Sequence, residues 1–282
     1  MKLLRYGPRG HEKPGLCDGD GNIRDLSSVV NDIAGNNLSP TMIMRLQKIK
    51  TATLPLVQNN PRLGACVGHV GKFMCIGLNY LDHAKETKAE IPKEPIIFMK
   101  ATSAINGPND DVIIPRNSHK TDWEVELGVV IGKEGKYISE EDALNYVVGY
   151  CVINDVSERA FQLEGTGQWT KGKSCDTFGP IGPWLVTKDE INDPQDLKLW
   201  LEVDGKLYQN GNTKNMIFGV AKLVSYLSRF FTLCPGDIIS TGTPSGVGLG
   251  QKPEPIYLKA GQLVRCGIQE LGEQTAKFVA DT

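Results

Sequence analysis

The amino-acid sequence predicts an α+β fold that is mainly β. Strand-like apolar segments outnumber helical patterns in the 282 residues, and they do not alternate regularly with helices as in a doubly wound parallel sheet. A hairpin signal supports this fold class, because residues 199–203 and 206–208 flank Asp204-Gly205, a pair that suits a type I′ turn. We therefore expect an antiparallel or mixed sheet with a few helices.

Residues 1–65 are predicted to form a small N-terminal α+β domain. Two short strand-like runs flank residues 18–22, and a helical pattern covers residues 41–49. Residues 18–22 begin like a calcium-binding EF-hand loop, but Ile23 and Val29 stand where that loop requires glycine and glutamate. We interpret this run as a turn between two strands.

Residues 66–282 are predicted to form a second, larger domain, which follows a connector at residues 58–61. Helical patterns cover residues 80–88, 139–145 and 215–229, and Ser139 is a candidate N-cap for the second of them. The β signals are more numerous and lie at residues 72–78, 95–101, 111–115, 123–132, 149–154, 182–187, 197–209, 236–242 and 262–268.

Composition argues against several classes of partner. The formal net charge is −2 without a long basic or acidic block, so we expect neither nucleic acid nor a membrane surface as the main partner. No apolar run approaches the ~18 residues that span a bilayer. The seven cysteines are dispersed without a C-x-x-C pair, which is typical of reduced thiols. A cytoplasmic protein is the expectation.

Residues 167–174 match the P-loop pattern G-x-x-x-x-G-K-S. That loop binds phosphates only between a buried strand and a helix N-terminus. Residues 161–167 do not have a buried-strand pattern, and residues 175–183 contain glycines and prolines that break a helix. We therefore reject nucleotide binding at this segment.

Two glutamates are predicted to share one face of a strand. In residues 123–131 apolar side chains alternate with Glu124 and Glu126, whose positions lie about 6.5–7 Å apart along an extended chain. Two such charges repel each other by roughly 2–2.5 kcal/mol at an effective dielectric constant near 20. The alternative interpretation is an edge strand whose polar face contacts water.

Three features favour a metal site over that alternative. Residues 129–131 make the segment continuously apolar, as in a strand covered on both faces. Gly128 leaves space on the carboxylate face, and the apolar run 149–154 places Asp155 at its end. Three oxygen donors suit a hard cation, Mg²⁺ first, with Mn²⁺ or Ca²⁺ as alternatives. The metal ligands would then be Glu124, Glu126 and Asp155.

A second candidate group lies on the helix predicted for residues 80–88. His83 and Glu86 are three residues apart, so a helix places them on one face and in contact. A carboxylate beside an imidazole orients it as a general base. A surface His–Glu pair without a catalytic role is the alternative. The remaining histidines have no comparable partner, and we interpret them as structural or exposed: His11, His69 and His119.

Several short motifs follow one another between about residues 72 and 272. They are Gly77-x-Asn79-Tyr80-x-x-His83-Ala84-x-Glu86, Glu124-x-Glu126-Leu127, Asn154-Asp155-x-Ser157-x-Arg159-x-x-Gln162, Gly172-Lys173-Ser174, Gly182-Pro183, Pro235-Gly236-Asp237 and Thr241-Gly242-Thr243-Pro244-x-Gly246-Val247-Gly248. Each is weak alone, but in this order they closely resemble the fumarylacetoacetate hydrolase family. The whole chain looks most like a bacterial branch that hydrolyses 2,4-diketo-3-deoxy sugar acids such as fuconate or rhamnonate derivatives, whose relatives are often labelled ureidoglycolate lyase.

The resemblance implies a fold and a set of roles. It implies a mixed β-roll, barrel-like core in residues 66–282 as the catalytic domain, and a homodimer. The family's metal ligands fall on the three acids named above, and its water-activating dyad, on a lid helix, falls on His83 and Glu86. Polar residues that hold the substrate match Lys173, Arg159 and Gln162, and Thr243 matches a contact to the substrate carboxylate. Asp82 is a weaker candidate for a fourth ligand, and we expect that it is not one.

The implied reaction is hydrolysis of a C–C bond in a 2,4-diketo acid, an acylpyruvate or a diketo-deoxy sugar acid, to pyruvate and a carboxylic acid. Lys173 would stabilise the oxyanion that forms when water attacks. Arg159 is expected either to clamp a carboxylate or to pair with Asp155 or Glu158 and shape the loop. Decarboxylation or isomerisation of a β-keto acid, ureidoglycolate lyase activity, and a catalytically silent sugar-acid-binding protein are the alternatives.

Overall fold

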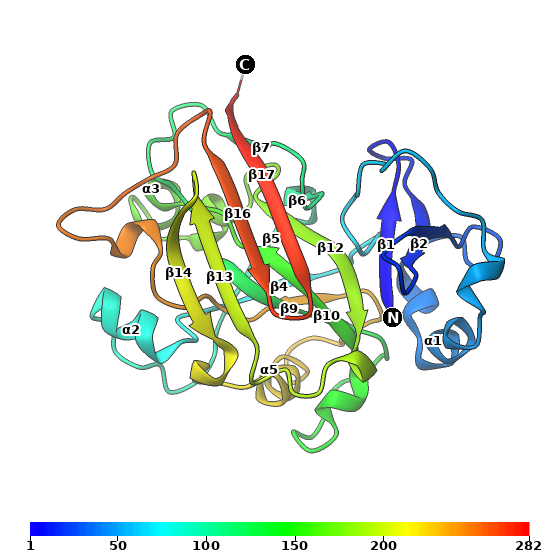
Figure 1. Cartoon of the computed structure of the whole chain (residues 1–282). Helices are drawn as coiled ribbons and strands as arrows, with labels where there is room; N and C mark the ends of the chain where they lie inside the picture. Colours follow the sequence, from blue (N-terminus) through cyan, green and yellow to red (C-terminus); the bar gives the residue numbers. More distant parts are fainter. Residues whose placement is uncertain (282) are drawn as a thin grey trace.

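The computed structural model of the protein describes residues 1–281, and most of its strands lie in two open sheets (Figure 1). The larger sheet has ten strands. From one edge to the other they are β3 (Ile23–Asp25), β2 (Lys13–Cys17), β1 (Lys2–Tyr6), β12 (Gly179–Thr187), β10 (Val147–Asn154), β9 (Val125–Ile131), β15 (Ile238–Ser240), β4 (Phe73–Gly77) and β5 (Ile96–Lys100), with β6 (Ile105–Asn106) beside β12.

The smaller sheet has five strands and packs across the middle of the larger one. Its order is β14 (Lys206–Asn212), β13 (Lys198–Val203), β16 (Leu263–Ile268), β17 (Gly272–Ala280) and β7 (Val112–Ile114), and a separate ribbon pairs β8 (Thr121–Asp122) with β11 (Ser157–Glu158). Side chains of both sheets, such as Leu127 on β9 and Leu201 on β13, share one buried core. The mainly β α+β prediction is confirmed; the sheets are mixed and do not close into a barrel.

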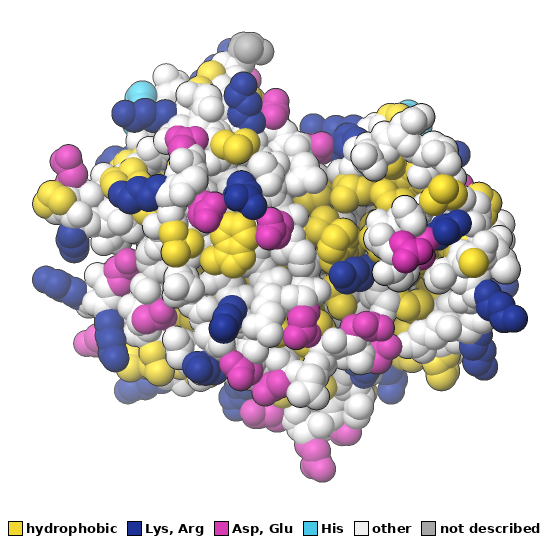
Figure 2. Space-filling model, in the orientation of Figure 1, with side chains coloured by type: hydrophobic (Ala, Val, Ile, Leu, Met, Phe, Trp, Pro, Cys, Tyr) yellow, Lys and Arg dark blue, Asp and Glu magenta, His cyan; other side chains and the backbone are white. Residues whose placement is uncertain are grey.

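The described part of the chain contains five α-helices: α1 (Pro40–Gln47), α2 (Leu81–Thr87), α3 (Arg159–Leu163), α4 (Trp169–Lys173) and α5 (Val220–Leu227). None of the helices in residues 1–281 has the length and apolar character that a membrane span requires. Figure 2 shows basic and acidic side chains interspersed over most of one face of the molecule, with acidic side chains gathered toward its lower edge.

Residues 1–65 form a lobe at one side of the molecule (Figure 1). The lobe continues the large sheet, because β1 pairs antiparallel with β12, and its side chains share a buried cluster with Phe73 and Ile153. As expected, residues 18–22 form the turn between β2 and β3, where Oδ1 of Asp18 accepts hydrogen bonds from the amides of Asp20 and Asn22. The division into two domains stays a prediction.

The structure corrects the prediction of a helix at residues 139–145. Oγ of Ser139 accepts a hydrogen bond from the amide of Asp142, but only a turn and a short 3-10 helix at Ala143–Tyr146 follow. The next residues enter β10, whose pairing with β9 and β12 outweighs the local helical preference. The hairpin of β13 and β14 is confirmed, with positive φ at both Asp204 and Gly205.

The context around residues 167–174 is not that of a P-loop. The segment is preceded by helix α3 instead of a buried strand, and α4 ends at Lys173 inside the motif. The chain then enters β12 at Gly179. This arrangement leaves no helix N-terminus after the motif to receive phosphates, as the sequence indicated.

Candidate metal and substrate site

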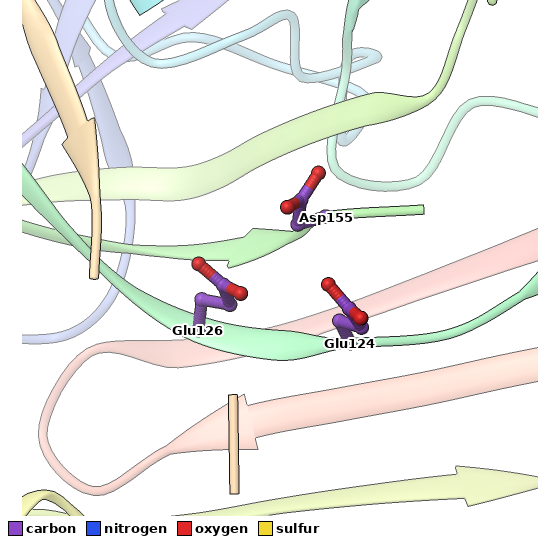
Figure 3. Close-up of side chains that lie close together, drawn as sticks. All are labelled: Glu124, Glu126 and Asp155. Carbon is purple, nitrogen blue, oxygen red and sulfur yellow. The ribbon is translucent and has the colours of Figure 1, made fainter. Parts of the chain in front are cut away.

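Three carboxylates meet where β9 and β10 lie side by side (Figure 3). Glu124 directly precedes β9, Glu126 lies in β9, and Asp155 directly follows β10. The amide of Asp155 donates a 2.8 Å hydrogen bond to the carbonyl of Glu124, which fixes the register at this end. One carboxylate oxygen from each residue lies within 4.8 Å of the others, and all three side chains are buried. The structure thus brings together the three acids that the sequence singled out.

Buried cations contact two of these acids. Nζ of Lys173 lies 2.5 Å from Oε2 of Glu124 and 2.7 Å from Oδ2 of Asp155. Nζ of Lys100 lies 2.5 Å from Oδ1 of Asp155, and Nη2 of Arg159 lies 2.7 Å from Oε1 of Glu124. Burial alone would raise the pKa of Glu124, but the charges of Lys173 and Arg159 lower it to about 2.

Glu126 differs because its hydrogen-bond donors are neutral. Its Oε2 atom accepts 2.6 Å and 2.8 Å hydrogen bonds from Oγ of Ser240 and the amide of Gly242. Burial and the negative charges of Asp155 and Glu124 raise the pKa of Glu126 well above its usual value. Glu126 is therefore the acid whose ionised form gains most from an added cation.

The chemistry of this donor set fits a hard divalent ion. Mg²⁺ and Mn²⁺ prefer carboxylate oxygens, and the group contains three of them and neither histidine nor cysteine. A divalent ion between them would also relieve the repulsion among the carboxylates. Asp82 lies outside this group, because its Oδ2 atom is 3.1 Å from Oγ of Ser245.

The structure corrects the interpretation of Gly128. We expected this glycine to leave space beside the carboxylates, but neighbouring side chains fill that space. A Cβ atom at position 128 would lie 2.7 Å from Sγ of Cys151 and 2.7 Å from Cδ1 of Ile153. Gly128 therefore permits close packing of β10 on β9 instead of making room for a ligand.

The His–Glu pair forms on α2 as the spacing predicted. Nδ1 of His83 lies 3.1 Å from Oε2 of Glu86, and Oε1 of Glu86 accepts a 2.9 Å hydrogen bond from the amide of Gly246. An ionised carboxylate can only accept, so a neutral His83 would donate from Nδ1 to Glu86 and leave the lone pair on Nε2. Such an imidazole is ready to accept a proton from water.

One loop contacts both the carboxylate group and the dyad. This loop, residues 240–246, begins at the last residue of β15 and donates hydrogen bonds to Glu126 at its start and to Glu86 at its end. Asn79 holds the loop in turn, because its side-chain Nδ2 atom donates a 2.8 Å hydrogen bond to the carbonyl of Thr241. The loop thus fixes the position of α2 relative to β9.

A cavity of about 180 Å³ opens above the carboxylates. Seven of the nine residues that the sequence singled out line it: His83, Glu124, Glu126, Arg159, Gln162, Lys173 and Thr243. The other two, Asp155 and Glu86, contact lining residues from behind. The cavity therefore joins two of the three candidate metal ligands, the candidate base and the candidate substrate-binding residues in one space.

Arg159 does not pair with Asp155 or Glu158, which was one of its two expected roles. Its Nε atom lies 2.8 Å from Oδ2 of Asp122, and its Nη1 atom lies 3.0 Å from Oε1 of Gln162. Together with its contact to Glu124, these bonds fix the guanidinium at the cavity wall. Each nitrogen of the guanidinium is thus engaged, and N–H groups on Nη1 and Nη2 remain for a ligand.

Thr243 lines the cavity, but its hydroxyl group already has partners. Oγ1 donates a 2.9 Å hydrogen bond to the carbonyl of Val125 and accepts a 2.8 Å bond from Nε2 of Gln209. Its hydroxyl proton is therefore committed to the backbone of β9. A ligand at this position would meet the rest of Thr243 instead of a free donor.

Two residues of the charge network were missed by sequence reasoning, Lys100 and Asp122. Lys100 ends the apolar strand β5, where its side chain is fully buried. A lysine at the end of an apolar strand needs an anionic partner if it is buried, and Asp155 is that partner. The carboxylate of Asp122 accepts hydrogen bonds from the backbone amides of Gly248 and Leu249 and from Nε of Arg159.

The mainly β fold and the buried group of three carboxylates, which could hold a divalent ion, define the class of protein, and comparison with known proteins gives the family. The family model "Fumarylacetoacetate (FAA) hydrolase C-terminal" matches residues 72–279. The chain belongs to the fumarylacetoacetate hydrolase family.

The similarity to individual known proteins covers all or nearly all of the chain. A protein of Burkholderia lata named "Putative hydrolase" is 64% identical over 274 residues, which is 97% of each chain. The structure of 2-hydroxyhepta-2,4-diene-1,7-dioate isomerase from Mycobacterium marinum is 33% identical, with a TM-score of 0.77, over 100% of this chain and 99% of that one. Maleylpyruvate hydrolase from Sphingobium sp. SYK-6, in complex with manganese(II) and pyruvate, is 27% identical, with a TM-score of 0.82, over 100% of both.

Proposed function

We propose that the protein is a divalent-metal-dependent hydrolase that cleaves a C–C bond of a 2,4-diketo acid. The substrate is an acylpyruvate or a 2,4-diketo-3-deoxy sugar acid, and the products are pyruvate and a carboxylic acid. The observation that carries this proposal is one cavity lined by Glu124, Glu126, His83 and Lys173, with Asp155 completing the group of three buried carboxylates at its wall. The similar maleylpyruvate hydrolase, which binds manganese and pyruvate, supports it.

The metal would be held by Glu124, Glu126 and Asp155. Mg²⁺ or Mn²⁺ there would polarise the 2-oxo acid end of the substrate as a Lewis acid. Arg159 and Gln162 lie beside this position and would orient the same end of the substrate.

His83 would act as the general base. His83 lines the cavity, and Glu86 holds its ring through Nδ1. Nε2 would take a proton from a water whose oxygen attacks the C4 carbonyl of the substrate. Lys173 would stabilise the oxyanion at C4, exchanging one of its carboxylate contacts for this oxygen.

The reaction balances with one water. The C3–C4 bond breaks, C4 leaves as a carboxylic acid that carries the water oxygen, and the bonding electron pair stays on C3. C3 then takes a proton, which gives pyruvate. Closure of α2 over the cavity would exclude bulk water during these steps.

Isomerisation of a β-keto or dienol acid is the second candidate, because the Mycobacterium marinum neighbour is named an isomerase. It would use His83 to move a proton between carbon atoms without attack by water. A product of unchanged mass identifies isomerisation, and release of CO2 identifies decarboxylation. Glyoxylate would identify a ureidoglycolate lyase, and tight binding without turnover a silent binding protein.

The test is to incubate the Mg²⁺- or Mn²⁺-loaded protein with acylpyruvates and diketo-deoxy sugar acids. We expect pyruvate and one acid in equal amounts, identified by mass. His83→Ala should abolish turnover and leave metal binding intact, whereas His119→Ala, at an exposed histidine, should behave as the wild type. Native turnover by His83→Ala would show that the dyad assignment is wrong. The homodimer also stays a prediction, which light scattering after gel filtration checks.

A further inference from the structure

Building on the proposed hydrolase function, we propose that the cavity selects 2,4-diketo acids whose acyl arm is short and ends in an apolar group. Diketo acids whose arm ends in a second carboxylate are rejected. The selection arises from six residues that we call the apolar wall: Ile76, Leu78, Phe98, Leu163, Trp169 and Leu249.

The apolar wall begins directly beside the charged end of the cavity. Trp169 and Lys173 are four residues apart on α4, so both side chains lie on one face of that helix. The ring of Phe98 lies 5.1 Å from Nζ of Lys173 and packs edge-on against Trp169, with the ring centres 5.4 Å apart. A substrate whose 2-oxo acid end sits at the carboxylates and whose C4 oxygen lies at Lys173 therefore places its acyl arm along Phe98 and Trp169.

The indole of Trp169 is held in a defined position. A Cβ atom at Gly77 would lie 2.4 Å from Cζ3 of Trp169, so the ring packs directly on the backbone of β4. Only a residue without a side chain allows this approach. The wall is thus a preformed apolar surface built on a strand.

The cavity offers no partner for a second carboxylate. Among its lining residues the cations other than His83 are Arg159 and Lys173, and both already contact the acids at the other end. A carboxylate placed against the wall would lose water without gaining a charge partner. Such uncompensated burial disfavours the dicarboxylate, whereas a methyl group gains by the same burial.

The size of the cavity limits the length of the arm. A dry cavity of about 150 Å³ accommodates a benzene-sized ligand, and this one measures about 180 Å³. The 2-oxo acid end uses most of that space, which leaves room for a few further atoms. Leu163, 46% exposed, lies where the wall meets solvent.

This selectivity separates the chain from two of its structural neighbours. Maleylpyruvate and 2-hydroxyhepta-2,4-diene-1,7-dioate, in the names of those proteins, both carry a carboxylate at each end. The wall instead suits an arm that ends in a methyl group, as in a short acylpyruvate or a diketo sugar acid deoxygenated at its last carbon.

The test compares two diketo acids with the same carbon chain, butanoylpyruvate, which ends in methyl, and succinylpyruvate, which ends in a carboxylate. Pyruvate release by the Mn²⁺-loaded enzyme should give a kcat/KM at least about 100-fold higher for butanoylpyruvate. Calorimetric binding of both compounds to Mn²⁺-loaded His83→Ala gives the same comparison without turnover. Equal or reversed preference in binding overturns the selectivity, whereas absence of pyruvate with the preference retained overturns only the hydrolase function.

A positive charge introduced into the apolar wall tests whether the wall causes the preference for butanoylpyruvate. Leu163→Arg, at an exposed position, should shift the kcat/KM ratio and the binding ratio toward succinylpyruvate by at least about 10-fold. Leu163→Gln, the matched polar variant without a charge, should shift both ratios less than threefold, within about 0.7 kcal/mol. A ratio that does not move in Leu163→Arg, or that moves equally in both variants, contradicts the role of the wall.

Discussion

Nζ of Lys100 lies 2.5 Å from Oδ1 of Asp155, and both side chains are fully buried. The same ammonium donates a 3.0 Å hydrogen bond to the carbonyl of Val156. Lys100 thereby holds the end of β10 against the end of β5 and fixes one oxygen of Asp155. The remaining oxygen of that carboxylate faces Lys173 and the carboxylate group.

Replacing Lys100 with methionine should destabilise the metal-free protein by about 3 kcal/mol, because it leaves a buried carboxylate with one cation fewer. Saturating Mn²⁺ should recover a large part of this loss, since the ion supplies positive charge to Asp155. Urea unfolding with and without Mn²⁺ measures both effects. Lys72→Met is the matched control, because it breaks the Lys72–Asp237 pair, 2.7 Å long and outside the site. Mn²⁺ should leave the loss in Lys72→Met unchanged.

Glu126→Gln should weaken Mn²⁺ binding by at least about 100-fold, because an amide replaces a charged ligand in the group. The fold should persist, since the glutamine oxygen can still accept from Ser240 and Gly242. Calorimetric titration with Mn²⁺ measures the affinity, and Glu202→Gln on β13 is the control. Unchanged affinity in Glu126→Gln would remove this residue from the ligand set.

Glu86→Gln should lower kcat roughly 10- to 100-fold with a smaller change in KM, because an amide orients His83 poorly and stabilises the imidazolium less. The effect is smaller than that of removing the base itself. Glu90→Gln, an exposed acid after the same helix, should leave kcat unchanged. Equal losses in the two variants would mean that the lid segment responds to any lost charge instead of to the dyad.

Acid should weaken the packing within the N-terminal lobe through Glu12, because its partners Arg5 and Arg62 lie in the same lobe. Burial alone would raise the pKa of Glu12, but its hydrogen bond to Arg62, with the charge of Arg5, lowers the pKa below 4.5. A lowered pKa in the folded state gives stability that is present above pH 4.5 and is lost as the pH falls through the folded value.

Glu12→Gln should therefore destabilise the protein at pH 7 by at most roughly 1 kcal/mol, the scale of a partly exposed ion pair. The difference between wild type and variant should shrink below pH 4.5. Urea unfolding at pH 7 and at successively lower pH measures it. A difference that grows on acidification would contradict the sign of this pKa shift.

The site was more predictable than its surroundings. The alternation in residues 123–131 and the position of Asp155 after an apolar run place three acids at one end of two neighbouring strands, provided that those strands pair. The i, i+3 spacing of His83 and Glu86 depends only on a local helix. Both arguments use short-range geometry, and the motif order joined them into one site.

The cationic partners of the carboxylates were harder to predict from the sequence. Lys100 reaches Asp155 only because β5 and β10 end near each other, although three other strands separate them in the sheet. Strand order over such distances is not encoded in local periodicity. The same limit explains Gly128, whose free face is decided by the register with Cys151 on β10.

Local propensity also failed to predict secondary structure where strand pairing in the sheet determines the conformation. The acidic segment after Ser139 has a helix-start pattern, yet the chain must reach β10 within a few residues and forms only a 3-10 turn. In the lobe, β1 (Lys2–Tyr6) was not expected, and it is a strand because it pairs with both β2 and β12. Pairing partners far along the chain decide such elements.

The loop at residues 240–246 touches Glu126 with its first residues and Glu86 with its last. In the proposed reaction, the metal ion that Glu126 would help to hold and the imidazole that Glu86 orients would therefore be positioned by one short piece of backbone instead of by two independent supports. A shift of this piece would carry both groups in the same direction and leave their separation nearly unchanged. We therefore expect the relative position of the two groups to depend more on substitutions within these few residues than on small movements of the surrounding sheets.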